Sequence, residues 1–361
     1  MSQQKHFEEM LREDVALAPM TTIGIGGRAR HFAEITTTEA LAAGAQWARA
    51  RGEALFVIGG GSNIIVSDRG FDGLVLRLSI RGVEHSVNAG GVVISAGAGE
   101  EWEPLVENCV KRGWAGFECL SGIPGRVGAT PIQNVGAYGQ ETRDTMISLE
   151  AFDLVEDKVV NITAEECDFG YRTSRFKNRD RGRFVITRVS YRLSPDGAPT
   201  IRYPELERYL EMSGGARTVT DVRAAVLALR RRKAMVIDPL DSDSRSVGSF
   251  FVNPTVSVQE FEAVKSRAGI VSDMPAFPVG ENEIKLSAGW LIERSGIERG
   301  HILGNVGIST KHALAIVNRG GGSASEVIKL KELIQKRVLD RFGIRLKPEP
   351  VFVGFDQDLE P

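Results

Sequence analysis

The chain has 361 residues, of which 42% are hydrophobic and 25% are charged, and its formal net charge is -2. This length allows two or three domains, and the composition is that of a soluble globular protein. The balanced charge gives no general basic surface for nucleic acid, and no apolar run is long enough for a membrane span, so we expect neither partner.

The N-terminal part of the chain predicts a helix and two strands around a glycine turn. Residues 36–52 read as a helix, with Thr36 and Glu39 at capping-box spacing and Gly52 suited to its C-terminus. The strand ALFVI then enters a turn at residues 59–61, and NIIVSD follows as a second strand. A Rossmann turn opens a helix instead. This turn is therefore either a plain glycine turn or a loop whose N–H groups approach an anion.

Residues 75–193 are rich in predicted strands: LVLRL, VVISAGAG, LEAFDLV, KVVNIT and RFVITRVSYRL. A helix is predicted near residues 101–112. The segment 120–142 is different, because it is long, rich in glycine and proline, and without clear periodicity. Its low charge and its apolar residues argue against disorder, so we interpret it as backbone that wraps closely around a ligand.

The C-terminal part of the chain adds predicted helices at about residues 221–233, at AGWLIERSG and at SASEVIKLKELIQKRVLDRFG. Ser323 and Glu326 form a capping box at the start of the last helix, and Gly343 suits its end. Turn-rich segments suggest a boundary near residues 200–217. The pattern as a whole is that of an α+β protein.

The segment VGSFFVNP, residues 247–254, predicts a strand in which Ser249 and Asn253 share one face with Phe251. Two interpretations are open. The polar side chains bond to nearby backbone, as buried polar groups usually do, or the serine is held for chemistry and has partners elsewhere in the chain.

Five other polar residues have two interpretations each. Tyr171 and Arg172 lie in a basic turn, and Tyr203 precedes Pro204 in what we interpret as an exposed connection. Lys233 ends a helix, and Glu349 stands between two prolines that set an extended backbone. Each is either an ordinary solvated or packed side chain or part of a binding site.

Three cysteines and five scattered histidines show no CxxC pair and no metal-ligand spacing, so we expect no metal site and a reducing cytosol. The polar start of the chain, MSQQKHFEEMLRED, is unlike a secretory signal. These features predict a cytoplasmic protein.

The combination of motifs is more specific than any one of them. Five segments occur in this order: GGGSN at 59–63, SGIPGRVGATPIQNVGAYGQE at 121–141, FGYR at 169–172, GSFFVNP at 248–254 and PEPVF at 348–352. Together they resemble the UDP-N-acetylenolpyruvoylglucosamine reductase family, flavoenzymes of bacterial cell-wall precursor synthesis. The resemblance runs from about Thr21 to Phe355, and IRYPEL is similar to the family type that has an extra tyrosine-bearing loop.

The resemblance implies a split FAD-binding domain of two α/β subdomains and a separate α+β substrate-binding domain. The expected limits are 1–212 for the FAD domain, with subdomains of about 1–78 and 79–212, then 213–342 for the substrate domain, and 343–361 for a C-terminal segment that returns to the FAD domain. A cytoplasmic monomer is expected.

The implied reaction passes a hydride from NADPH to FAD and then to the vinyl carbon of UDP-N-acetylglucosamine enolpyruvate, which becomes UDP-N-acetylmuramate. Ser249 matches the serine that protonates the enolate, and Arg172 and Glu349 match the groups that flank it. A cation there stabilises the developing negative charge. A serine hydroxyl is a weak acid and needs a strongly basic carbanion to act.

The resemblance also implies binding residues. Tyr203, Lys233 and Asn253 match residues for the substrate's diphosphate and carboxylate, and Tyr171 is a further candidate. Val252 stands where some relatives have a lysine. The expected FAD-binding residues are Gly59, Gly60, Gly61, Ser62, Asn63, Ser121, Gly122, Ile123, Pro124, Gly125, Gly128, Gln133, Asn134, Gly136, Ala137 and Tyr138.

Three alternatives are weighed against this function. A serine hydrolase would need a GxSxG elbow, which is absent, and a histidine near Ser249, which the local sequence lacks. A non-catalytic flavin- or nucleotide-sugar-binding protein is disfavoured because Arg172, Ser249 and Glu349 occur together. An oxidase of the same flavin superfamily would be favoured by a His or Cys for covalent flavin in the glycine-rich loop, and none occurs there.

Overall fold

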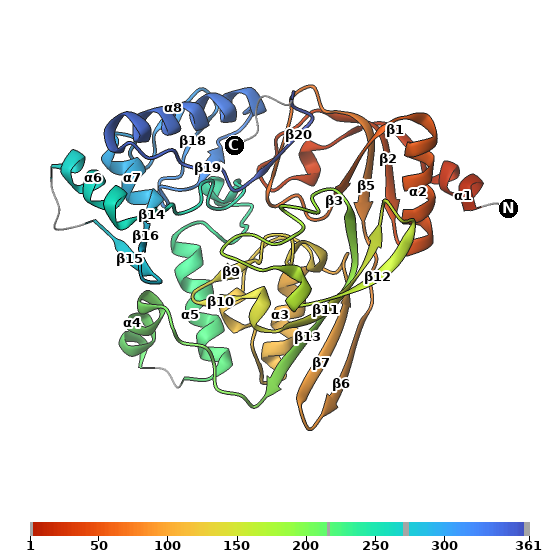
Figure 1. Ribbon diagram of the computed structural model, residues 1–361, viewed down its shortest axis with the longest axis horizontal. Helices are drawn as coiled ribbons and strands as arrows, with labels where there is room; N and C mark the ends of the chain where they lie inside the picture. Colours follow the sequence, from red (N-terminus) through yellow and green to blue (C-terminus); the bar gives the residue numbers. More distant parts are fainter. Residues whose placement is uncertain (1–2, 215–216, 270–273, 357–361) are drawn as a thin grey trace. The chain divides into compact units, whose positions relative to one another are not determined.

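A computed structural model describes residues 3–214, 217–269 and 274–356 (Figure 1). The chain forms two compact units. Unit 1 takes its residues from Met1–Val15, Ala29–Gly61 and Asp72–Val236, and unit 2 takes its residues from Ala16–Arg28, Ser62–Phe71 and Ile237–Pro361.

The first sheet of unit 1 carries the glycine turn. Its strand order is β1-β2-β5-β3, with bounds Arg12–Ala16, Arg28–Ile35, Phe71–Leu78 and Ala54–Ile58. Helix α2 (Thr38–Arg51) precedes β3 and packs against α1 (Gln3–Met10). Helix α2 is confirmed, and Gly52 ends it at φ +65° as predicted. The predicted N-cap is wrong by one residue, because the hydroxyl of Thr37, not Thr36, accepts from the Ala40 N–H.

The second sheet of unit 1 has the order β12-β11-β13-β7-β6, and a short strand, β8, pairs with the end of β13. The bounds are Val83–Asn88 for β6, Gly91–Gly97 for β7, Trp114–Ala115 for β8, Met146–Asp153 for β11, Lys158–Thr163 for β12 and Phe184–Pro195 for β13. Helix α3 (Trp102–Lys111) supplies Trp102, whose ring packs with those of Phe117 and Tyr191.

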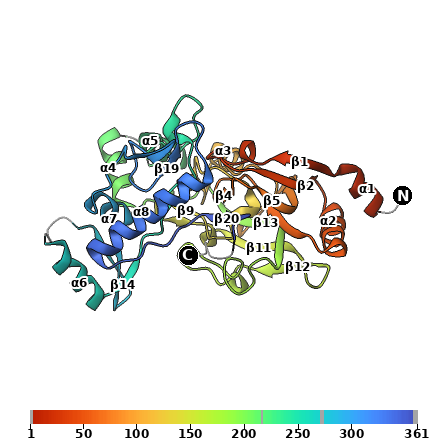
Figure 2. The same ribbon diagram turned by 90° about the horizontal axis from the view of Figure 1, so that it is seen from above.

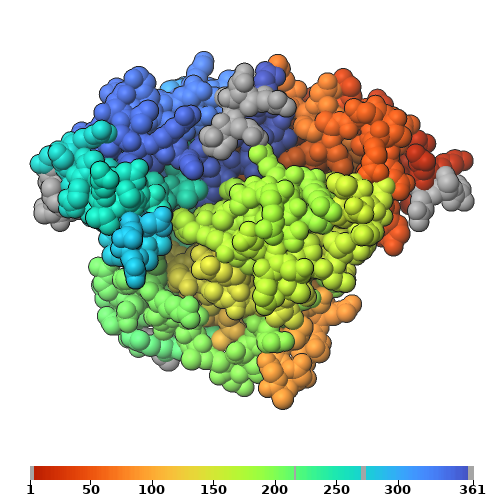
Figure 3. Space-filling view, viewed as in Figure 1, coloured from red at the N-terminus to blue at the C-terminus, as the bar shows by residue number. Residues whose placement is uncertain are grey.

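Strand β6 is the one long strand of this sheet that the sequence did not predict. It forms a free edge of the sheet, and all six of its side chains are exposed. The β6–β7 hairpin is part of the orange surface in Figure 3. VEHSVN has only two strongly apolar residues, Val83 and Val87, and both are exposed, so the segment lacks the apolar run that marked the other strands.

Asp153 stabilises the turn between β11 and β12 through hydrogen bonds to its carboxylate. Its buried carboxylate accepts hydrogen bonds from Arg183 Nη2 at 2.6 Å and from the Val155 N–H at 2.9 Å. The hydrogen bond from Arg183, followed by those from the turn N–H groups, lowers the pKa of Asp153 to about 2.

The depressed pKa of Asp153 predicts a pH-dependent stability. A carboxylate whose pKa is lower in the folded chain stabilises the fold above its unfolded pKa and loses that effect as the pH falls. We therefore expect wild type to lose stability between about pH 4 and pH 2. Asp153→Asn should lower the melting temperature at pH 7, and its difference from wild type should shrink in that acid window. An unchanged difference at pH 3 and pH 7 would contradict this role.

The last part of unit 1 is a helix pair. Helices α4 (Pro204–Ser213) and α5 (Val219–Arg232) pack together around Leu206, Val222 and Leu229. Helix α5 agrees with the predicted helix near 221–233. Helix α4 was not predicted, because Pro204 suggested an exposed connection. Proline is instead well suited to the first turn of a helix, where its missing N–H costs nothing.

Unit 2 has two three-stranded antiparallel sheets, β14-β16-β15 and β17-β18-β19, and a parallel pair, β4 with β20. The strand bounds are Ile64–Val66 for β4, Thr255–Ser257 for β14, Ala276–Val279 for β15, Glu283–Leu286 for β16, Ile302–Leu303 for β17, Val306–Ile308 for β18, Ile316–Asn318 for β19 and Val351–Val353 for β20. The helices are α6 (Val258–Ala268), α7 (Ala288–Arg294) and α8 (Ala324–Phe342).

Helix α8 organises unit 2, because it packs against α6, α7 and β18 (Figures 1 and 2). Its predicted limits are confirmed. Ser323 and Glu326 form the capping box, and Gly343 ends the helix at φ +76°. The Asp68 carboxylate also accepts from the N–H groups of Ala324 and Ser325 at 2.7 and 2.9 Å. Asp68 thus joins the segment that carries β4 to the start of α8.

The predicted strand 247–254 is wrong. Gly248 has φ +77°, and Phe251 forms only an isolated bridge with Pro348. Phe250 and Phe251 are both buried, so neighbouring side chains do not alternate between two faces. The strand prediction placed successive side chains on opposite faces, whereas the adjacent residues Phe250 and Phe251 both pack into the core of unit 2. The predicted α+β class itself is confirmed. No helix in the described ranges is long and apolar enough to cross a bilayer.

Candidate active site

The glycine turn 59–61 of unit 1 lies against the loop that contains Gly125. A Cβ atom on Gly60 would be 2.7 Å from the Gly125 Cα, so two backbones meet where no side chain fits. Gly61 has φ +63°, a conformation that favours glycine. Within the described residues the N–H groups of Gly60 and Gly61 have no hydrogen-bond partner in the protein. They are thus available to a ligand.

Buried positive charge accompanies this turn. Arg77 pairs with Ile58, the residue before the turn, across β5 and β3. In the described structure the buried Arg77 Nε has no hydrogen-bond partner. Arg126 is buried beside Gly125 and donates to Ser79 Oγ at 2.8 Å and to the Leu78 carbonyl. Burial, and then repulsion from Arg77 and Arg81, lowers the pKa of Arg126. Free N–H groups beside buried guanidinium groups fit an anion such as the diphosphate of FAD.

Several residues of the predicted FAD loop are used inside the protein. The Gly122 N–H donates to the Glu103 carboxylate, and the Gly122 carbonyl accepts from Arg230 Nη2 at 3.2 Å. The Ser121 hydroxyl donates to the Glu118 carbonyl at 2.7 Å and is fully buried. These contacts fix the shape of the loop, and they engage the Ser121 hydroxyl and both backbone polar groups of Gly122.

The other residues predicted for FAD have varied surroundings. Gly128 approaches Ala98 so closely that a Cβ would lie 2.5 Å from the Ala98 Cβ, which indicates close packing. Ile123 and Ala137 pack on the core of unit 1. Ser62, Pro124, Gln133 and Gly136 are half-buried. Ser62 and Asn63 belong to unit 2 and follow the turn of unit 1 directly in sequence.

Asn134 connects the loop to the FGYR segment. Its Nδ2 donates to the Glu141 carboxylate at 2.8 Å and to the Gly170 carbonyl at 3.1 Å. Arg172 of the FGYR segment makes a second link to the loop, because its Nη2 donates a hydrogen bond to the Gly136 carbonyl at 2.7 Å. Both Asn134 and Arg172 have positive φ, at +46° and +56°. Such backbone strain in non-glycine residues concentrates at functional sites. Tyr171, beside Arg172, is exposed.

Tyr203 and Lys233 lie together in unit 1, as the substrate-binding hypothesis requires. Both are close to Tyr138, whose ring centroid lies 5.5 Å from that of Tyr203 and 5.9 Å from Lys233 Nζ. The Lys233 ammonium also pairs with the Glu205 carboxylate at 2.6 Å. Burial raises the pKa of Tyr203. The cluster therefore offers a neutral phenol and a cation that is already paired.

In unit 2, Ser249 and Glu349 are both next to Phe250: Ser249 precedes it in the chain, and Glu349 is hydrogen-bonded to it. The Phe250 N–H donates to the Leu314 carbonyl at 2.7 Å, and the Phe250 carbonyl accepts from the Glu349 N–H at 2.9 Å. Phe250 therefore lies between the segments that carry His312 and Glu349, and Ser249 precedes it directly. The Ser249 Oγ is 3.3 Å from His312 Nε2. Local sequence did not suggest this histidine, which is 63 residues away.

Asn253 and Asn63 have structural contacts in unit 2. The Asn253 Oδ1 accepts from the Ala288 N–H at 2.9 Å, at the start of α7. The Asn63 carbonyl accepts from the Val351 N–H at 3.0 Å, and Asn63 Nδ2 lies 3.4 Å from the Glu349 carbonyl. Asn63 thus orients the backbone that carries Glu349, whereas Asn253 holds a helix terminus.

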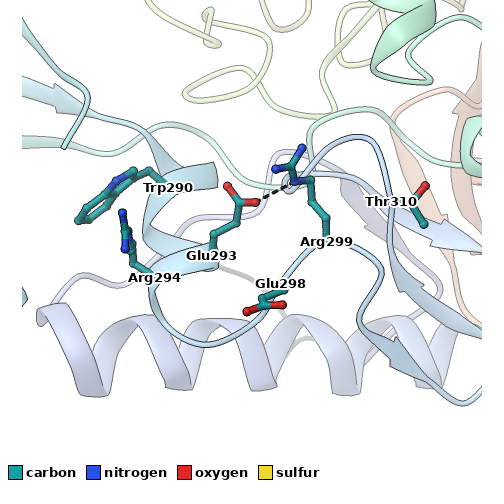
Figure 4. Close-up of a pocket in the computed structure, with 6 residues that line it drawn as sticks. All are labelled: Trp290, Glu293, Arg294, Glu298, Arg299 and Thr310. Carbon is teal, nitrogen blue, oxygen red and sulfur yellow. Dashed lines mark hydrogen bonds and ion pairs between the residues drawn. The ribbon is translucent and has the colours of Figure 1, made fainter. Parts of the chain in front are cut away.

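A polar cavity of about 620 Å³ lies elsewhere in unit 2, beside α7 (Figure 4). Its lining residues are Trp290, Glu293, Arg294, Glu298, Arg299 and Thr310, and Glu293 pairs with Arg299 at 2.8 Å. None of the predicted site residues lines it. Among the described residues no cluster of His, Cys, Asp or Glu is arranged to hold a metal ion.

Comparison with known proteins decides the family. A model described as "UDP-N-acetylenolpyruvoylglucosamine reductase, C-terminal domain" matches residues 238–353, and one described as "FAD binding domain" matches residues 29–163. A UDP-N-acetylenolpyruvoylglucosamine reductase of Thermobifida fusca is 44% identical over 348 residues, which cover 94% of this chain and 97% of the relative. This chain belongs to the UDP-N-acetylenolpyruvoylglucosamine reductase family. The predicted family and its class, a flavin-dependent oxidoreductase, are confirmed.

Other members of the family are similar to this chain over nearly its whole length. The UDP-N-acetylenolpyruvoylglucosamine reductase of Saccharopolyspora erythraea is 44% identical and covers 94% of each chain. The crystal structure of the reductase from Thermus caldophilus has a TM-score of 0.64 at 26% identity and covers 95% of this chain and 99% of that one. The predicted cofactors, FAD and NADPH, accompany the family. FAD fits the N–H groups of Gly60 and Gly61, which have no partner among the described residues, together with the buried Nε of Arg77 and the buried Arg126.

Proposed function

We propose that this protein uses NADPH to reduce UDP-N-acetylglucosamine enolpyruvate to UDP-N-acetylmuramate, a step in peptidoglycan precursor synthesis. The observation that carries the proposal is the 44% identity over 94% of the chain to a UDP-N-acetylenolpyruvoylglucosamine reductase. Arg172, Ser249 and Glu349 are the proposed catalytic residues. The proposal includes a cytoplasmic monomer, and light scattering of the purified protein tests the oligomeric state.

The units suggest how the roles are divided. FAD is proposed to bind in unit 1 at residues 59–61 and 121–138, within the part that matches the FAD binding domain. Arg172, Tyr203 and Lys233 also belong to unit 1, whereas Ser249, Asn253 and Glu349 belong to unit 2. The limits 1–212, 213–342 and 343–361 remain a prediction. The compact units divide the chain differently, since α5 falls in unit 1 and β20 in unit 2.

Bound FAD supplies hydride transfer between NADPH and the enolpyruvyl double bond. The chain's own residues then control the negative charge and the proton. Ser249 gives its hydroxyl proton to the carbon beside the substrate carboxylate, and the Arg172 guanidinium stabilises the charge that develops there. Glu349 is held by the backbone bond to Phe250 and is proposed to assist at the same centre.

The test of the function is anaerobic mixing of the purified protein, first with NADPH and then with the enolpyruvyl nucleotide. The protein should be yellow and should release free FAD on heating. Its flavin absorbance should fall with NADPH and return with the nucleotide. A folded protein that takes up no FAD, or a reduced flavin that the nucleotide does not reoxidise, would contradict the proposal.

Tyr203 and Lys233 are proposed to bind the substrate's diphosphate. Lys233→Ala and Tyr203→Phe should each raise the KM for the nucleotide, by about ten-fold or more for the lysine, because charge-assisted contacts contribute roughly 1.5–3 kcal/mol. Flavin reduction by NADPH should change little. Glu205→Gln is the control, because it removes the acidic partner at 2.6 Å and keeps the lysine. Its KM should not rise. An unchanged KM in both site variants would contradict the assignment.

A further inference from the structure

We propose that His312 is a positioning residue that donates a hydrogen bond from Nε2–H to the Ser249 hydroxyl oxygen. The inference rests on the proposed function, in which Ser249 is the proton donor. It adds a residue that lies outside the matched motifs, and it assigns the direction of the hydrogen bond and thereby the orientation of the serine proton.

The backbone of unit 2 sets the distance between the two side chains. The Phe250 N–H donates to the Leu314 carbonyl at 2.7 Å, which places Ser249 beside the segment that carries His312. The His312 carbonyl accepts from the Ala315 N–H at 3.1 Å, so His312 begins a turn. Both side chains are half-buried, and the Oγ to Nε2 distance is 3.3 Å. The pair is therefore held by backbone bonds on both sides rather than by a chance surface contact.

The direction of the hydrogen bond follows from what the serine has to do. A serine hydroxyl has one proton and two lone pairs. If His312 accepted, the one proton would point at the imidazole ring and not at the substrate carbon. If His312 donates, it occupies a lone pair and the proton is free to point elsewhere. The proposed role of Ser249 therefore requires that the imidazole ring of His312 carries a proton on Nε2.

The same bond stabilises the product side of the proton transfer. The Ser249 O–H bond breaks, a C–H bond forms on the substrate, and the negative charge moves to the serine oxygen. A hydrogen bond to a charged oxygen is stronger than one to a neutral hydroxyl, so the His312 N–H favours the transfer. A proton from water then restores the serine.

The test compares His312→Gln with His312→Leu. Glutamine is uncharged and offers an N–H donor at about the reach of Nε2, whereas leucine offers no donor. His312→Leu should keep FAD and normal flavin reduction by NADPH, and should slow reoxidation by the nucleotide about 10²-fold. His312→Gln should recover most of that loss. His301→Gln, at another half-buried histidine of unit 2, is the control and should behave as wild type. If glutamine is as slow as leucine, the donor role is wrong.

A double variant separates this proposal from the function on which it rests. If His312 acts through the serine, then adding His312→Leu to Ser249→Ala should cause almost no further loss. A second loss as large as the first would overturn the proposal even if Ser249 is the acid. A Ser249→Ala variant that reoxidises at the normal rate would instead refute the role of Ser249. Hydrolysis of an activated ester by wild type, lost in both single variants, would indicate a Ser–His nucleophile and also overturn the proposal.

Discussion

Ser249→Ala should reduce its flavin with NADPH at a near-normal rate but reoxidise with the enolpyruvyl nucleotide roughly 10²–10⁴-fold more slowly. The reason is that the first half-reaction creates no basic carbon and needs no acid, whereas the second leaves a carbanion that must be protonated. Nucleotide affinity should change little, because alanine removes one hydroxyl and leaves the backbone bonds of Phe250 in place. Anaerobic stopped-flow absorbance measures both rates.

Two further serine variants make this result specific. Ser249→Cys should keep some activity, because a thiol also donates a proton. Ser295→Ala is the matched control, since it removes a buried hydroxyl of unit 2 that donates to the Ile292 carbonyl at 2.8 Å. It should lower stability without separating the half-reactions. If Ser249→Ala slows both half-reactions equally, the serine has a structural role.

Gly60→Ala should yield a protein that retains little or no FAD. The added Cβ would lie 2.7 Å from the Gly125 Cα, and the obstructing atom is backbone, which cannot rotate away. Either the turn or the loop 122–128 must move, and both are proposed to contact the cofactor. Flavin content after purification and the affinity for added FAD measure the effect. Circular dichroism shows whether the variant is folded.

Gly59→Ala separates an effect of the added Cβ on protein stability from an effect on FAD binding. Its Cβ would meet only the Arg126 Cβ at 3.9 Å, an ordinary contact, so the protein itself should accommodate it. If this variant is fully stable and still binds FAD weakly, the ligand requires the space at the turn. A folded Gly60→Ala protein that binds FAD as tightly as wild type would contradict the proposed site.

Elements with local signals were predicted well from the sequence. Helix α8 has a capping box at Ser323 and ends at Gly343, so its limits depend on residues within a few positions of each terminus. The strands β5, β7, β11 and β13 carry apolar runs and are largely buried, and β12 was predicted from its β-branched residues although most of its side chains are exposed. The predictions for β6 and for residues 247–254 failed because these segments lack such local signals. All six side chains of β6 are exposed, so the strand has no buried apolar run to mark it. Residues 247–254 contain two adjacent phenylalanines that are both buried, which the alternation of a strand does not predict.

The sequence by itself determined the family and the kinds of side chain available for chemistry, because five motifs in a fixed order are a property of the chain alone. It placed Arg172, Ser249 and Glu349 as candidates but could not show their neighbours. Only the tertiary structure decided that Ser249 lies 3.3 Å from His312 and that Lys233 is paired with Glu205. These partners are 63 and 28 residues apart. Such contacts leave no periodic pattern in the chain, since they arise when backbone hydrogen bonds and core packing bring distant segments side by side.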